Sequence, residues 1–322
     1  MCTAINDNRY GHLFGRTLDL EYSYNERVVI SPRNFKFNFI NEKASESGTA
    51  IIGMAHIEDG MPLYYDAINE FGLGIATLNF PHFCHYFKHN EKHYNIASFE
   101  VIPWILRHCK SVSEAIELLK EAAVTNDCFN SLQTTPLHWL IGDKKSAVTF
   151  EPTAEGIKIY SNPFGVLTNS PEFSYHCLNL ANYMHISEDS QPNLIYPDTD
   201  ILQYSRGMGG IGLPGDFSSA SRFVKAVYTK NKTLSSNEKL GNISRFFHIM
   251  NTVSQPYGCV KAENGLPVSS IYTSCADTEN GIYYFTTYNC RRIRGVSMFE
   301  KEINGNELIS FDIAGGEDIL IM

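Results

Sequence analysis

Short apolar stretches separated by turn-rich pieces make up the first third of the chain, a pattern typical of strands. It predicts strands at residues 12–14, 27–30, 50–57 and 73–78. The apolar spacing then becomes helical. Apolar residues at positions 101, 102, 105 and 106 share one helix face, and those at positions 112, 115, 116 and 119 share a second. Ser111 and Glu114 predict a capping box for the second helix.

Strand patterns return in the second half of the chain. We expect strands at 137–141, 147–150 and 157–160, helices at about 219–228 and 243–253, and final strands at 271–275, 282–288 and 292–298. Asn280 and Gly281 predict a hairpin turn between two of the final strands. Strands at both ends with helical blocks between them favour the α+β class, with antiparallel sheets covered by helices. The pattern leaves the order of the layers open. No repeat or linker divides the chain, so we expect one domain over residues 1–322.

The composition is globular and acidic. Of the 322 residues, 43% are hydrophobic and 19% are charged, which allows a sizeable core. The net charge of −9 argues against nucleic acid or an anionic membrane as the main partner. No run approaches the roughly 18 apolar residues of a membrane-spanning helix. The first residues lack the basic and apolar regions of a signal peptide, so we expect a cytoplasmic protein.

Eight cysteines are present, and none belongs to a C-x-x-C pair. In a reducing cytoplasm we expect free thiols. Cys2 differs from the others because its small side chain permits removal of Met1, which leaves a thiol and a free α-amine on one residue. An α-amine ordinarily titrates near neutral pH, so this residue would carry a nucleophile and its own general base. Taken alone, a cysteine at position 2 is more often without function.

Charged and amide side chains elsewhere supply what such a nucleophile needs. Arg16 would favour the thiolate and Asp19 would hold the thiol or α-amine, the alternative being a surface ion pair. Asn79 and Asn169 each follow a predicted strand and could build an oxyanion hole, although each is also a typical turn residue. Arg222 lies in the first turn of a predicted helix. Its segment is either only a turn and a helix N-cap, or it sends Arg222 into the site as a charge anchor.

A histidine-rich stretch indicates a different class of function. His82, Cys84, His85, His89 and His93 fall within twelve residues. If the stretch were helical, the last three histidines would share a face with a spacing suited to zinc or copper. A preceding proline and mixed polarity favour a loop instead. A metal-binding protein that is not an enzyme is nevertheless kept as an alternative function.

The segments that carry these residues, taken in order, resemble the choloylglycine hydrolase family, which includes bile salt hydrolases and penicillin V acylases. The likeness extends over nearly the whole chain. Its segments are MCTAI, FGRTLDLEYSYNE, SPRNFKF, NEFGLGIATLNFP, PLHWL, NPFGVLTNSPEF, YSRGMGGIGLPGDFSSASRF and YTSCADTENGIYYFTTY. Any one segment would be a weak match, but so many in the same order make the resemblance specific.

The resemblance implies the four-layer αββα sandwich of N-terminal nucleophile hydrolases, a homotetramer, and neither cofactor nor metal. By the family pattern the catalytic positions are Cys2, Arg16, Asp19, Asn79, Asn169 and Arg222. Cys2 is the nucleophile, and the side-chain amide of Asn169 with the backbone N–H of Asn79 forms the oxyanion hole. The implied reaction is deconjugation of glycine- or taurine-conjugated bile salts through a Cys2 thioester.

Substrate choice within the family is less clearly indicated. Asparagine at position 79 is similar to bile salt hydrolases, whereas penicillin V acylases tend to carry tyrosine. Thr17 has parallels among the acylases, so an acylase acting on penicillin V or N-acyl homoserine lactones is the alternative. By position, the acyl pocket is expected to be lined by Leu18, Tyr65, Cys128 and Leu132. Glycine or taurine preference is not evident from the sequence.

Overall fold

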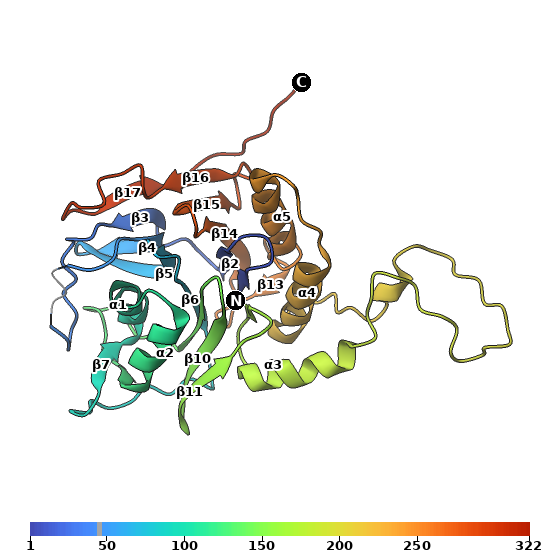
Figure 1. The fold of residues 1–322 in the computed structure, drawn as a ribbon, viewed down its shortest axis with the longest axis horizontal. Helices are drawn as coiled ribbons and strands as arrows, with labels where there is room; N and C mark the ends of the chain where they lie inside the picture. Colours follow the sequence, from blue (N-terminus) through green and yellow to red (C-terminus); the bar gives the residue numbers. More distant parts are fainter. Residues whose placement is uncertain (44–46) are drawn as a thin grey trace.

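Two antiparallel sheets stacked face to face form the centre of the molecule (Figure 1). The structure, a computed structural model, describes residues 1–43 and 47–322. Within these ranges the first sheet has the order β12-β1-β2-β14-β15-β16, with β13 paired to β14. Its strands are β1 (Cys2–Asp7), β2 (Leu13–Leu20), β12 (Val166–Leu167), β13 (Val260–Lys261), β14 (Pro267–Asp277), β15 (Ile282–Thr287) and β16 (Arg294–Ser297).

The second sheet has the order β11-β10-β9-β6-β5-β4-β3-β17. Its strands are β3 (Arg27–Ser31), β4 (Ile51–Glu58), β5 (Met61–Asn69), β6 (Gly74–Asn79), β9 (Leu137–Gly142), β10 (Ala147–Thr153), β11 (Gly156–Ser161) and β17 (Ile309–Asp312). A separate parallel pair joins β7 (Tyr94–Ala97) to β8 (Ala122–Thr125). Both large sheets therefore combine strands from the two ends of the chain.

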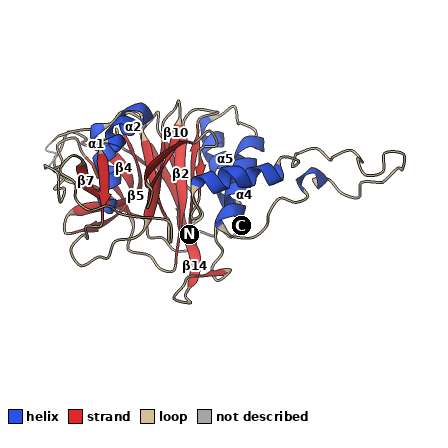
Figure 2. Cartoon of the chain, turned by 90° about the horizontal axis from the view of Figure 1, so that it is seen from below, coloured by secondary structure: helices blue, strands red, loops and turns tan. Residues whose placement is uncertain are grey.

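Helices cover the outer faces of both sheets, as Figure 2 shows in a view from below. On the second sheet, α1 (Val101–His108) packs against β5 and β6. Next to it, α2 (Val112–Lys120) packs against β8 of the separate parallel pair. On the first sheet, α4 (Ser219–Lys232) packs against β1 and β12, and α5 (Lys239–Asn251) packs against β14 and β2. A further helix, α3 (Phe173–Leu180), contacts α4. This arrangement confirms the predicted α+β class and the four-layer αββα sandwich.

The core has two parts, one on each side of the second sheet. The first lies between the sheets and under α4 and α5, and includes Ile5, Leu78 and Phe246. The second lies between the second sheet and the helices α1 and α2, and includes Ile105 and Trp139. All six residues of β1 are buried, because the second sheet covers one face of this strand and α4 covers the other. The usual alternation of buried and exposed residues is therefore lost in β1.

The predicted elements agree with the structure in type more than in extent. Residues 27–30, 50–57 and 73–78 fall on β3, β4 and β6, but residues 12–14 are only the beginning of β2. Ser111 Oγ accepts the N–H of Glu114 at 3.3 Å, whereas the Glu114 carboxylate accepts from the N–H of Lys110, so the capping box is half formed. Gly281, with φ of 60°, completes the predicted hairpin between β14 and β15. The strands β1, β5, β7, β8, β13 and β17 and the helix α3 were not predicted.

Residues 184–216, which we call the arm, leave the body of the molecule after α3 and return to it at α4 (Figures 1 and 2). Several of its large apolar side chains are exposed, among them Ile195 at 89% and Leu202 at 86%. An ion pair between Glu188 and Lys232 connects the arm to α4. In the part of the chain that the structure describes, no helix combines the length and apolarity needed to cross a bilayer.

Candidate active site

Cys2 begins β1, and its position in the ladder is opposite Leu18 of β2. Its side chain is 2% exposed and forms part of the lining of a cavity of about 570 Å³. Cavities of this size commonly bind small molecules. The nucleophile proposed from the sequence therefore lies where a bound molecule would meet it.

Asn169, which follows β12, contacts the main chain of Cys2 directly. Its Oδ1 accepts the N–H of Cys2 at 2.7 Å and a guanidinium N–H of Arg222 at 2.7 Å. Its Nδ2 donates to the carbonyl oxygen of Asn79 at 2.8 Å. One Nδ2–H is used in this way, so the second is available to a further acceptor.

Arg222 reaches Cys2 from the first sheet's covering helix. It lies in the first turn of α4, after the N-cap Ser218, and it is fully buried. Its Nη1 donates to the Cys2 carbonyl and, at 2.7 Å, to Oγ1 of Thr3. Burial lowers the pKa of Arg222, while nearby Asp19 and Cys2 raise it. The segment thus forms the expected helix N-cap and also directs Arg222 to the main chain of Cys2.

Arg16 is also fully buried, on β2, and it too lines the cavity. Its Nη1 donates to the carbonyl oxygens of Tyr65, at 3.0 Å, and Thr77. Its Nη2 is buried and has no hydrogen-bond partner within the described ranges. Burial opposes the charge of Arg16, but Cys2 heads the groups that hold its pKa above the ordinary value. The guanidinium therefore shares the wall of the cavity with Cys2.

Asp19 accepts from Oγ of Ser270 at 2.5 Å and from Oγ1 of Thr17 at 3.2 Å. It is fully buried, and no ion pair joins it to Arg16 in the described chain. The alternative of a surface ion pair between these residues is therefore wrong. The main chain of Asp19 pairs with Met1, whose N donates to the Asp19 carbonyl at 2.6 Å and whose carbonyl accepts the Asp19 N–H at 2.9 Å. Met1 thus continues the strand beyond Cys2.

The cavity is bordered by three of the four residues expected to line the acyl pocket, Leu18, Tyr65 and Leu132, and also by Asn79. Cys128 does not line it: its side chain is exposed, and the next residue lines the cavity instead. Sequence reasoning missed most of the aromatic lining, which is supplied by Tyr22, Tyr24, Tyr64, Phe99, Phe129 and Trp139. These residues come from strands, helix edges and loops far apart in the sequence, and no local motif connects them.

The histidine-rich stretch does not form the helix that its metal hypothesis required. Residues 80–93 are loop and turn apart from an isolated bridge at Phe87. His89 contacts Asp127 at 2.9 Å, while His85 packs against the edge of Phe87. Across residues 1–43 and 47–322, no three histidine, cysteine or acidic side chains gather as a metal site would need.

Comparison with known proteins identifies the class. The fold superimposes on the mutant C2A conjugated bile acid hydrolase from Clostridium perfringens with a TM-score of 0.91, at 33% identity, over 100% of this chain and 99% of that one. It also superimposes on penicillin V acylase from Agrobacterium tumefaciens with a TM-score of 0.78, at 17% identity, over 100% and 94% of the two chains. The fold is therefore that of an N-terminal nucleophile amide hydrolase.

The sequence identifies one family within this class. Residues 2–311 match the sequence model of a family described as linear amide C–N hydrolases, choloylglycine hydrolase family. This chain belongs to that family. It is 43% identical to a bile salt hydrolase/transferase of Lactiplantibacillus plantarum over 97% of each protein. It is 35% identical to a bile salt hydrolase/transferase of Clostridium perfringens over 97% of this chain and 96% of the relative.

Proposed function

We propose that this chain hydrolyses the amide bond of glycine- or taurine-conjugated bile salts, with Cys2 as the nucleophile. The observation that carries the proposal is the placement of Cys2: its thiol borders a cavity of about 570 Å³, and its main-chain nitrogen is held by Asn169. The cavity walls are rich in aliphatic and aromatic side chains, among them Leu18, Phe99 and Phe129. Burial of a steroid against such walls contributes about 25 cal/mol per Å².

The reaction begins after Met1 is removed, which converts the Cys2 nitrogen into an α-amine. The Cys2 thiolate, favoured by Arg16, attacks the substrate carbonyl carbon. The resulting oxyanion accepts hydrogen bonds from the free Nδ2–H of Asn169 and from the backbone N–H of Asn79. The α-ammonium gives its proton to the departing glycine or taurine nitrogen as the C–N bond breaks, and a thioester remains.

The second half of the reaction returns the enzyme to its starting state. The α-amine takes a proton from water, and the hydroxide that forms attacks the thioester carbonyl. The C–S bond breaks, the free bile acid leaves, and Cys2 is again a thiolate beside an α-ammonium. Asp19 and Arg222 keep the α-amine and the Cys2 carbonyl in place during both halves. All proton transfers use groups of this chain and water.

The test is incubation of the purified enzyme with glycocholate and detection of free glycine with ninhydrin. We expect glycine release by the wild-type enzyme and none by Cys2→Ala, with unchanged circular dichroism. Taurocholate, penicillin V and an N-acyl homoserine lactone in parallel reactions separate the proposal from the acylase alternative. Cleavage of penicillin V with no glycine release from glycocholate would contradict the bile salt proposal.

We also propose that the enzyme is a homotetramer. The large apolar side chains exposed on the arm support an interface between copies, because such an interface would remove their apolar surface from water. Sedimentation velocity at micromolar concentration should give the mass of four chains, and substitution of Ile195 and Leu202 by aspartate should lower it. A wild-type enzyme that sediments as a monomer would contradict this proposal.

A further inference from the structure

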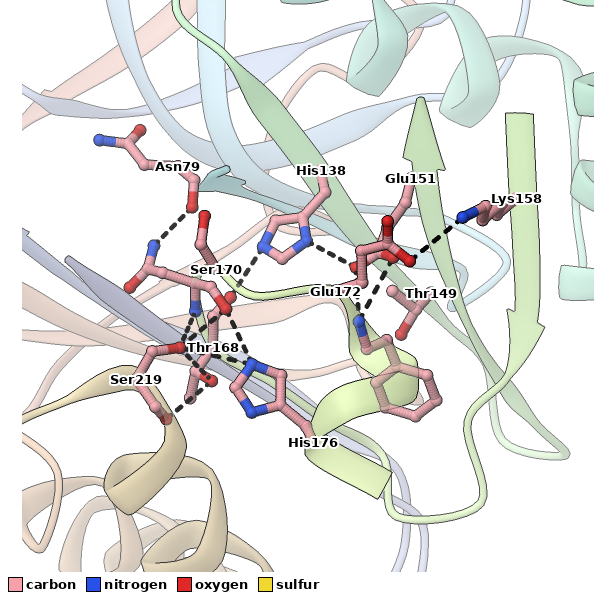
Figure 3. A network of polar contacts seen from close by, with 12 residues as sticks. Asn79, His138, Thr149, Glu151, Lys158, Thr168, Ser170, Glu172, His176 and Ser219 are labelled. Atoms are coloured by element: carbon pink, nitrogen blue, oxygen red, sulfur yellow. Dashed lines mark hydrogen bonds and ion pairs between the residues drawn. The ribbon is translucent and has the colours of Figure 1, made fainter. Parts of the chain in front are cut away.

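The segment that carries Asn169 is held on two sides by a network of polar contacts (Figure 3). The residues that make these contacts, His138, Glu151 and Ser219, are not among those that line the cavity. On the side of the second sheet, His138 lies between Oε1 of Glu151, at 3.0 Å, and the carbonyl oxygen of Thr168, at 2.8 Å. Both His138 and Glu151 are fully buried, and the His138 ring stacks on Phe80 at 4.3 Å. This contact fixes the residue immediately before Asn169.

On the other side, Ser219 of α4 contacts the backbone of Asn169 itself. The N–H of Asn169 donates to Ser219 Oγ at 2.9 Å. The hydroxyl proton of Ser219 is directed to the Asn169 carbonyl at 2.7 Å or to Oγ1 of Thr168 at 2.9 Å. The Asn169 carbonyl has a second partner, Nε2 of His176 at 2.9 Å, whereas Ser219 is the partner of the N–H.

Ser219 and Arg222 are three residues apart on one helix, so they occupy the same face of the first turn of α4. Ser219 holds the backbone of Asn169, and Arg222 holds its side-chain oxygen. One helical turn therefore fixes both ends of the residue whose amide faces Cys2. Burial of Asn169, which is 7% exposed, leaves no solvent to replace a lost contact.

We propose that Ser219 is a positioning residue that aims the oxyanion-binding amide of Asn169, an inference that rests on the proposed function. It acts through the backbone of Asn169 and touches no substrate. Without the hydroxyl, the Asn169 N–H is left buried and unpaired, and the backbone shifts to find another acceptor. The amide then moves away from the place where the oxyanion develops, and a displacement of about 1 Å is enough to cost about 10²-fold in rate.

The experiment compares Ser219→Ala with two further variants. In Ser219→Ala we expect kcat to fall about 10- to 100-fold and KM to stay within about twofold, because the oxyanion contact exists only in the transition state. Ser219→Thr keeps a hydroxyl and should recover most of kcat. Ser221→Ala is the matched control, since its hydroxyl lies on the same turn and contacts Asp216 at 2.5 Å. It should leave kcat near the wild-type value.

A second readout separates positioning from general damage. Alkylation of Cys2 by iodoacetamide needs the thiolate and no oxyanion hole, so its rate should be unchanged in Ser219→Ala. An unchanged kcat in this variant would overturn the proposal, as would a parallel loss of kcat and alkylation rate. All variants are assayed on glycocholate, taurocholate and penicillin V. A wild-type enzyme that cleaves only penicillin V would overturn the bile salt proposal while still testing Ser219 on that substrate.

Discussion

The side-chain oxygen of Asn169 lies 2.7 Å from the main-chain nitrogen of Cys2, although 167 residues separate them in the sequence. The same oxygen also accepts from Arg222. With two donors on one side, the carboxamide has a single orientation that satisfies all partners, and its nitrogen faces the Asn79 carbonyl. The amide is therefore held beside Cys2 in one orientation before any substrate binds.

Removal of Met1 is expected to be required for activity. The peptide bond to Met1 leaves the Cys2 nitrogen without the basic lone pair that the mechanism uses. Intact mass measurement of an active preparation should show a chain that begins at Cys2. A matched variant that carries one extra glycine before Met1 should fold normally. It should remain inactive as long as this extended N-terminus is retained. Full activity in a preparation that quantitatively keeps Met1 would exclude the α-amine as the base.

Loss of Arg16 should reduce both turnover and stability. Burial raises the pKa of Asp66, and Arg16 is the strongest of the groups that oppose this shift. Arg16→Leu should therefore lower kcat by about 10²-fold or more and lower the melting temperature, since it removes a positive charge that offsets the burial of Asp66. Arg16→Lys, which keeps the positive charge, should recover part of the melting temperature and part of kcat. A near-normal kcat in Arg16→Leu would show that Arg16 does not tune Cys2.

Stability should fall between pH 6.5 and pH 4 because of two buried histidines. Burial lowers the pKa of His12 and of His176 to about 4, from an ordinary value of 6.5. Below pH 6.5 the unfolded chain therefore binds protons that the folded chain does not, and the free energy of unfolding decreases by up to about 3 kcal/mol for each. Melting temperatures at pH 7.5 and 5.0 should differ less for His176→Gln than for the wild type. An equal difference in both proteins would show that His176 does not titrate in this range.

Asn79 should influence substrate choice because its position lines the cavity. A tyrosine there offers a stacking face for the phenoxyacetyl group of penicillin V and reduces the space for a steroid. We expect wild-type kcat/KM to be higher for glycocholate than for penicillin V, and Asn79→Tyr to move the ratio toward penicillin V by about 10- to 100-fold, the effect of a typical pocket contact. Asn79→Gln is the control for an altered side chain without a ring. An unchanged ratio would assign specificity to the loops.

Oxidants should inactivate the enzyme, whereas chelators should leave its activity unchanged. An accessible thiolate is the form most readily oxidised, so peroxide should inactivate the enzyme, and added thiol should restore it while oxidation stops at the sulfenic stage. EDTA should leave kcat unchanged. Inactivation by EDTA that zinc reverses would revive the metal hypothesis for the histidine-rich stretch.

The fold class could be predicted because apolar residues recur at regular strand and helix spacings, and clear turn residues separate the elements. The strand β5 was missed because its sequence, MPLYYDAIN, contains a proline and an aspartate, which are uncommon in buried strands. In the structure Asp66 is stabilised by hydroxyl groups of Tyr272, Ser274 and Tyr283 on β14 and β15. Those partners are more than 200 residues away in the sequence, so no local pattern could reveal them.

The site residues were predicted unevenly, for a similar reason. Cys2 and Asn169 carry recognisable chemistry within segments that resemble a known family. The lining of the cavity depends instead on which side of a loop each residue faces. Cys128 and Phe129 are adjacent, yet only the phenylalanine faces the cavity. Ser219 was identified only once the structure placed it against the backbone of Asn169.

The arm also divides the chain at a point where little holds it to the body. A protease that cuts within residues 184–216 would leave an N-terminal fragment and a C-terminal fragment. The fragments would stay together, because β14 pairs with β2 in one sheet and β17 pairs with β3 in the other. Such a nicked molecule would run as two bands on a denaturing gel and as one particle in gel filtration. The fold of this molecule therefore does not depend on an unbroken polypeptide chain within the arm.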